Sequence, residues 1–187
     1  EKIRLKAEDS LFLAGLDPQL YIHWYLPVRK LVSSVATIAQ YRTDEIPYAI
    51  ASFRSIDHTD QRLWKSGLLR DVIDSHFWLI ENSGRPLDSV FLEMNLSIDI
   101  IVDNLIRDEN RFNEITDYLF RLLERRSLFQ SSEYLALKVL NEVSCTIDSD
   151  LAKQLESYRA MKKGNIAPDF DFKVDILAPG YISANMP

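Results

Sequence analysis

Residues 86–105, with the sequence PLDSVFLEMNLSIDIIVDNL, decide the fold class of this chain. Apolar side chains recur there every three or four positions, so they gather on one face of a helix, with aspartate and asparagine opposite. The leading proline suits a first helical position, because its missing N–H would have no partner there. The stretch therefore predicts an amphipathic helix of about five turns. Its apolar stripe is Leu87, Val90, Phe91, Met94, Ile98, Ile101, Val102 and Leu105.

Helical stripes also fill the chain before this stretch. Asp17 precedes Pro18, a pair typical of a helix start. Pro27 lacks the N–H that a helix interior requires, so we expect two consecutive helices as far as residue 41. Pro47 favours a short helix that ends at about residue 55. A longer helix is expected from about Asp60 to Ile80, with the apolar face Leu69, Val72, Ile73, His76, Phe77 and Ile80.

Three more helices are predicted after residue 105. The first begins near Asn110, Ser131-Ser132 caps the second, and Asp148-Ser149 caps a third that carries Leu151, Leu155 and Tyr158. The short connections favour antiparallel neighbours. No internal repeat of roughly 20 to 50 residues stands out, so a regular helical-repeat array is not favoured. The sequence thus predicts an all-α fold, a compact bundle of about seven or eight helices with a short C-terminal β tail.

Composition excludes several classes of function. The chain has 187 residues, 47% of them apolar, and a net charge of -6, so it lacks the positive field that nucleic acids or anionic membranes attract. The densest basic patch, Arg121, Arg125 and Arg126, is interleaved with leucines, as on the solvated side of an amphipathic helix. No apolar run approaches the about 20 residues of a membrane span. We therefore expect neither a nucleic-acid partner nor a membrane span in this chain.

The pattern changes from helix to strand at Gly164. Apolar Phe170, Phe172, Val174 and Ile176 alternate with charged residues, which predicts a strand. An isolated hairpin is marginal in water and requires a sheet to join. We therefore expect a helical domain over residues 1–163, and residues 164–187 as the entry segment of a second domain that continues beyond this chain.

The segment GNIAPDF, with Gly164, Ala167, Pro168, Asp169 and Phe170, resembles the entry segment of thioredoxin-like domains of the peroxiredoxin and TlpA kind. The preceding helices resemble, in order and texture, the helical N-terminal region of envelope thiol-disulfide oxidoreductases. The resemblance implies a periplasmic or cell-envelope protein, with a downstream thioredoxin-like domain as partner and a protein substrate as a further candidate partner. It implies no catalytic residue, cofactor or metal in this chain, because the redox CxxC of that family would lie downstream.

The reactive residue types each have a structural interpretation. Cys145, the only cysteine, excludes an internal disulfide and a CxxC pair, and it is expected to be an inert core thiol rather than a surface thiol open to a mixed disulfide. His23 and His76 lack the spacing of a helical zinc site, and His76 is expected to be a hydrogen-bonded core residue. Asp99 and Asp103 lie one turn apart, as an acid-base pair or a cation site could, yet solvated carboxylates are the expectation.

Aromatic residues form two clusters, around Trp24 and Trp64, most of which core packing explains. Tyr25 and Trp78 lie off the apolar stripes and are therefore candidates for an interface, together with Phe170 and Phe172. The first interpretation is a non-catalytic accessory domain of a thioredoxin-like oxidoreductase.

Two alternatives remain open. One is a stand-alone helical interaction module whose tail strand pairs with Lys2 to Ala7, a segment of weak strand character. The other is a helical enzyme that uses His58, Asp57 and Asp60, although these three residues look more like a helix-capping turn.

Overall fold

The computed structural model describes residues 14–142, and this part of the chain is helical throughout its regular elements, as predicted. The N-terminal strand candidate, Cys145, the helix expected after residue 148 and the C-terminal β tail lie outside the described residues. The described elements are α2 (Tyr21–Tyr41), the 3-10 helix η1 (Thr43–Glu45), α3 (Ile46–Arg54), α4 (Gln61–Lys65), α5 (Leu69–Glu81), α6 (Leu87–Leu105), α7 (Glu109–Arg125) and α8 (Phe129–Glu142).

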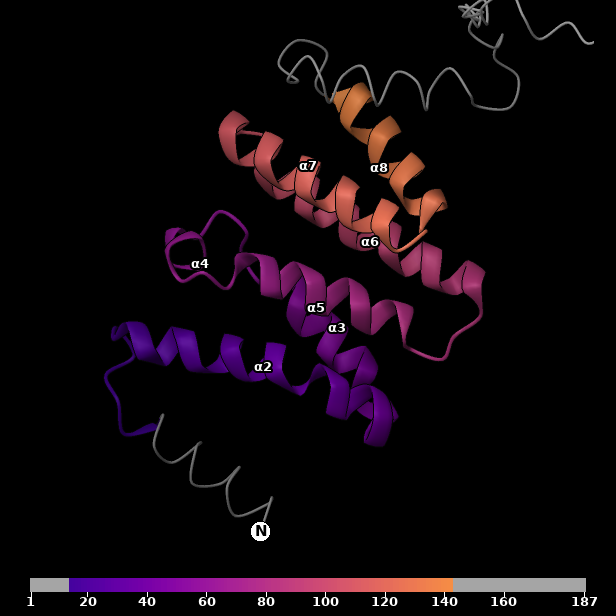
Figure 1. The fold of residues 1–187 in the computed structure, drawn as a ribbon. Coiled ribbons are helices and arrows are strands. Elements are labelled where there is room, and N and C mark those ends of the chain that lie inside the picture. The colour runs from indigo at the N-terminus through magenta and orange to yellow at the C-terminus, as the bar shows by residue number, and fades with distance from the viewer. Residues whose placement is uncertain (1–13, 143–187) are drawn as a thin grey trace, which may run out of the picture.

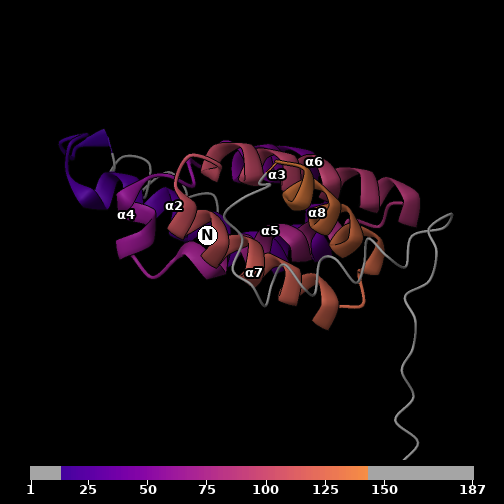
Figure 2. The same cartoon turned by 90° about the horizontal axis from the view of Figure 1, so that it is seen from above.

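The long helices form three hairpins, α2–α3, α5–α6 and α7–α8, which stack on one another (Figure 1). Helix α5 packs against both α2 and α3, and α6 packs against both α7 and α8. Seen from above, α3, α6 and α8 form one layer, with α5 and α7 in the other (Figure 2). The predicted bundle is therefore a two-layered stack of helical hairpins.

The apolar stripe of residues 86–105 lies at the centre of this stack. Six of its members are buried on α6, and Phe91 packs against the core from a half-buried position. The exception is Leu87, which is largely exposed because it is the first residue of the helix. The buried members are Val90, Met94, Ile98, Ile101, Val102 and Leu105.

The predicted break at Pro27 is wrong, because α2 runs without interruption from Tyr21 to Tyr41. Its apolar residues on both sides of the proline pack against the same core, and this packing outweighs the lost backbone hydrogen bond. The predicted start at Asp17 is also wrong. The Asp17 carboxylate accepts the Gln19 N–H at 2.8 Å within a turn that precedes the helix.

Replacing Pro27 with alanine is expected to stabilise the protein. Proline in a helix interior costs about 3 kcal/mol relative to alanine, and part of this is offset because proline also restricts the unfolded chain. We expect the free energy of unfolding to rise by about 1–2 kcal/mol, measured by urea denaturation. Pro47→Ala is the matched control, since Pro47 lies in the first turn of α3, and it should stabilise nothing. A destabilised Pro27→Ala protein would contradict the expectation.

The helix predicted from about Asp60 to Ile80 is two helices. Gly67 separates α4 from α5 with a backbone φ of 76°, a left-handed conformation that ends a helix. Asp60 caps α4 by accepting the Arg62 N–H at 2.8 Å. The apolar periodicity did not reveal this break, because every residue of the periodic face lies on α5, from Leu69 to Ile80.

Ser131 and Ser132 do not cap α8, which begins earlier, at Phe129. Both serines are buried, and their hydroxyl groups tie α8 to the neighbouring helices. Ser131 Oγ donates to Asn95 Oδ1 on α6 at 3.3 Å, and Ser132 Oγ donates to Glu124 on α7. A serine pair that resembles a cap in sequence therefore serves as an interhelical contact.

Candidate functional site

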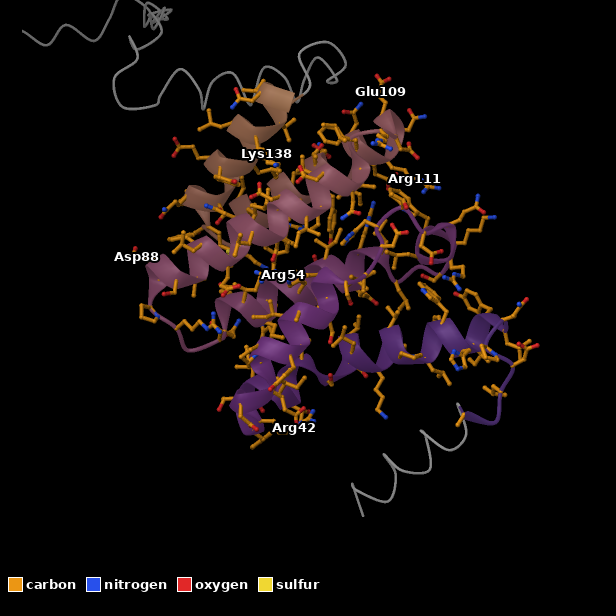
Figure 3. All side chains as sticks on the ribbon, turned by 180° about the vertical axis from the view of Figure 1, so that it is seen from behind. Arg42, Arg54, Asp88, Glu109, Arg111 and Lys138 are labelled. Carbon is orange, nitrogen blue, oxygen red and sulfur yellow. The ribbon has the colours of Figure 1, made fainter. Side chains whose placement is uncertain are left out.

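A polar cluster joins α3, α5 and α6 at the middle of the stack. The Arg54 guanidinium donates to Glu93 Oε2 at 2.6 Å and to the Glu93 carbonyl at 2.8 Å. Its Nε donates to Ser97 Oγ at 3.0 Å, and Ser97 Oγ lies 3.2 Å from His76 Nε2. Figure 3 labels Arg54 where α3 meets α6. We call these four residues the junction cluster.

Glu93 is held ionised by two arginines. Burial opposes its charge, but hydrogen bonds and charge from Arg54 and Arg85 prevail and lower the pKa of Glu93. The Arg85 guanidinium adds a 2.6 Å bond to Glu93 Oε1. The acidic member of the junction cluster is thus fully engaged by cations on both of its oxygens.

His76 is a hydrogen-bonded core histidine, as predicted. It is 2% exposed, and its ring stacks on Phe53 with 5.2 Å between ring centroids. Burial, followed by the charges of Arg54 and His58, lowers the pKa of His76 to about 3. The imidazole is therefore neutral at physiological pH. Since Ser97 is also fully buried, this serine-histidine pair has no access for a substrate.

His58 lies in the loop between α3 and α4 and is 1% exposed. Its Nδ1 is buried without a hydrogen-bond partner. Burial lowers the pKa of His58 to about 4, although Asp57 partly opposes this shift. This burial could not be predicted from the local pattern, because polar loop residues surround the histidine in the sequence.

The two carboxylates beside His58 shape the loop. Asp57 Oδ1 accepts the backbone N–H of Thr59 at 2.8 Å and its hydroxyl at 2.6 Å, and Asp60 caps α4. The helix-capping interpretation of this segment is thus confirmed. Both carboxylates already accept bonds from local donors, so their geometry adds no support to the alternative enzyme hypothesis.

The expectation of solvated carboxylates holds for Asp103, whose side chain is 65% exposed, but Asp99 is only 31% exposed, and both carboxylates pair with a lysine. Lys138 Nζ on α8 lies 3.0 Å from a carboxylate oxygen of each. The Tyr134 hydroxyl donates to Asp99 at 2.8 Å. Burial opposes the charge of Lys138, but its bonds to Asp103 and Asp99 prevail and raise its pKa. These four residues link α8 to α6, and we call them the Lys138 clamp.

The aromatic candidates Tyr25 and Trp78 are half-buried. Tyr25 packs against the core and stacks on Tyr21 with 5.6 Å between ring centroids. Phe170 and Phe172, the other two interface candidates, lie outside the described residues. An interface role for these four residues stays a prediction.

An exposed apolar patch on α6 and α8 was missed by the sequence reasoning. Leu92, Leu96 and Phe129 are 66%, 53% and 55% exposed. Leu92 and Leu96 lie one turn apart on α6, and Phe129 begins α8 two residues before Ser131, which bonds to Asn95 of α6. We call these three residues the α6–α8 patch. The i, i+4 spacing of Leu92 and Leu96 outside the buried stripe is the signal that could have found it.

A shallow hollow of about 400 Å³ lies between α2 and α3. Two of its charged side chains form an ion pair, in which Arg42 Nη1 lies 2.7 Å from Glu45 Oε2. Its apolar lining comes from Leu31, Ile38 and Ala49. The hollow is therefore a mixed surface without a converging set of catalytic groups.

No protein-family model, curated protein or solved structure matches this chain. Within residues 14–142, no three or more histidine, cysteine, aspartate or glutamate side chains are grouped so that they could hold a metal ion. In the same part of the chain, no helix has both the length and the apolar character needed to cross a membrane.

Proposed function

We propose that this chain is a non-catalytic helical accessory domain of a thioredoxin-like thiol-disulfide oxidoreductase of the periplasm or cell envelope. The resemblance of residues 164–170 to a thioredoxin-like entry segment motivates the proposal. The junction cluster supports it, because its arginine, glutamate, serine and histidine bond to one another across three helices, with His76 and Ser97 buried. A polar core of this kind stiffens a scaffold.

In this proposal the helical stack positions the downstream domain or presents a protein substrate to it. A CxxC in that domain performs the exchange, with its leading thiol acidified by a helix N-terminus. Tyr25 and Trp78 are the proposed contacts, since half-buried aromatic side chains contribute strongly to interfaces.

The coding sequence beyond Pro187 provides the first test, and we expect a CxxC motif or a peroxidatic cysteine there. In that longer protein, Trp78→Ala should slow disulfide exchange with a protein substrate such as insulin by about tenfold, the equivalent of about 1.4 kcal/mol of lost contact. Exchange with a small aromatic disulfide should keep its rate, because it needs no docking surface.

Tyr48→Ala is the matched control, because Tyr48 is an exposed aromatic residue on α3 that no contact in the proposal uses. It should leave both rates unchanged. Absence of any redox cysteine downstream would end the redox form of the proposal. Equal rates for Trp78→Ala and the unmodified protein would remove Trp78 from the contact.

A second candidate function is a stand-alone protein-interaction module, which the α6–α8 patch favours. Contiguous exposed apolar side chains often mark interaction surfaces. If the chain acts alone, Leu92→Ser with Leu96→Ser should abolish partner binding, whereas the exchange activity of a longer protein would not depend on them. The two functions therefore predict opposite sensitivities at Trp78 and at the patch.

A further inference from the structure

The contact of the α2–α3 hairpin with α5–α6 contains two buried imidazoles and an arginine. His58 comes from the α3–α4 loop, His76 from α5 and Arg54 from α3. Burial, followed by the charges of Arg54 and His58, lowers the pKa of His76. The polar link from this hairpin to α6 is made by Arg54, through Glu93 and Ser97. The contact between the two hairpins therefore contains both imidazoles in their neutral form.

Protonation disrupts this arrangement at both rings. Ser97 Oγ already accepts a hydrogen bond from Arg54 Nε, and a protonated His76 would add a second cation that faces the guanidinium. Protonation of His58 Nδ1 would create a buried N–H without an acceptor.

The nearby carboxylates compensate for these new charges only in part, since Asp57 opposes the lowering of the pKa of His58 without reversing it. On α6, Glu93 is bound by Arg54 and by Arg85 from the α5–α6 loop. In the α3–α4 loop, Asp57 accepts bonds from Thr59. Two added positive charges would thus lie in a region where the acidic groups already have partners.

We propose that this junction is an acid-released latch, in which protonation of His58 and His76 frees the α2–α3 hairpin from α5–α6 while the α7–α8 hairpin stays folded. The hairpin is at one end of the described stack and packs against α5 on a single side (Figure 1). The α7–α8 hairpin is joined to α6 by the Lys138 clamp, which contains no histidine. Acid therefore weakens one contact selectively.

The direction of the effect follows from the two lowered pKa values. The folded pKa values of about 4 and about 3 lie below the usual 6.5, so the contact is most stable above pH 6.5 and weakens as the pH falls toward 4. Relative to neutral pH, each histidine raises the equilibrium constant for opening by about 30-fold at pH 5, and the two together raise it by up to about a thousandfold.

Thiol protection measures the opening of each hairpin separately. In a Cys145→Ser background, Ile50→Cys places a thiol in the buried face of α3, and Val139→Cys places one in the buried face of α8. Each thiol reacts with 4,4′-dithiodipyridine, a reagent that also works in acid. Protection is the reaction rate of the same variant unfolded in urea divided by its rate in the folded protein, both at the same pH. Between pH 7.5 and pH 5, protection at position 50 should fall by at least about 30-fold, and protection at position 139 should change less than about threefold.

His58→Gln combined with His76→Gln should remove the pH dependence at position 50. An equal fall at both positions would overturn the latch in favour of global unfolding, and constant protection at position 50 would overturn it outright. If the double variant does not fold, NMR titration of the imidazole rings in the unmodified protein decides. Ring titrations near pH 6.5 in the folded state would refute the latch, and titrations below pH 5 would support it.

Discussion

Phe77→Ala should lower the free energy of unfolding by about 3–5 kcal/mol. Phe77 is fully buried and is among the largest side chains enclosed in the core, with its ring 5.5 Å from the His76 ring between centroids. Truncation removes the transfer free energy of the ring and leaves a cavity that α3 and α6 cannot fill, since both are fixed by the junction cluster. Urea unfolding followed by helical circular dichroism measures the loss.

Phe129→Ala provides the matched control for this core substitution. Phe129 carries the same side chain at the start of α8 but is largely exposed, so it should cost less than about 1 kcal/mol. Equal losses from the two substitutions would mean that the burial of Phe77 is not as described.

Arg54→Met should lower the free energy of unfolding by about 2–3 kcal/mol. Its side chain is only 20% exposed, and its removal takes away the Nε donor of Ser97 Oγ and one of the donors of the Glu93 carbonyl, which Ser97 Oγ also bonds at 3.1 Å. It also leaves the Glu93 carboxylate with Arg85 alone. The loss of one partner from a partly buried ion pair is costly because the remaining charge stays desolvated. Methionine keeps the apolar volume of the stem, so the measurement by urea unfolding isolates the polar bonds.

Arg121→Met is the control for the removal of an arginine charge. Arg121 is 69% exposed and pairs with Asp117 one turn away on α7, an arrangement that contributes about 0.3–0.5 kcal/mol. The cycle that combines Arg54→Met with Glu93→Gln should show a coupling energy above about 1 kcal/mol. Additive losses would show that the two side chains act independently.

Amphipathic periodicity was sufficient to predict the most regular helices. On α6 the predicted apolar stripe is buried except at Leu87 and at the half-buried Phe91. The pattern failed where a single backbone feature decides the outcome. Helix α2 continues through Pro27 because residues on both sides of the proline pack against the core. The left-handed backbone of Gly67 separates two helices in a segment whose side-chain pattern shows no interruption.

The partners of the polar residues could not be predicted in the same way. The core position of His76 followed from its place on an apolar stripe, but its neighbour Ser97 lies 21 residues away on another helix. Lys138 likewise bridges Asp99 and Asp103 from a distant part of the sequence, and only the stacking of hairpins brings α8 to α6. Such pairings depend on tertiary geometry, which the local periodicity does not encode.

The stacking of hairpins also separates the ends of the described part. Helix α2 lies at one end of the stack and α8 at the other, with α5–α6 between them (Figure 1). The two ends of most domains lie close together, so that a domain can be inserted into a host without spreading it. This stack would instead act as a spacer. Within the described residues, α2 and Glu142 lie at opposite ends of the stack, and the number of hairpins sets the distance between them.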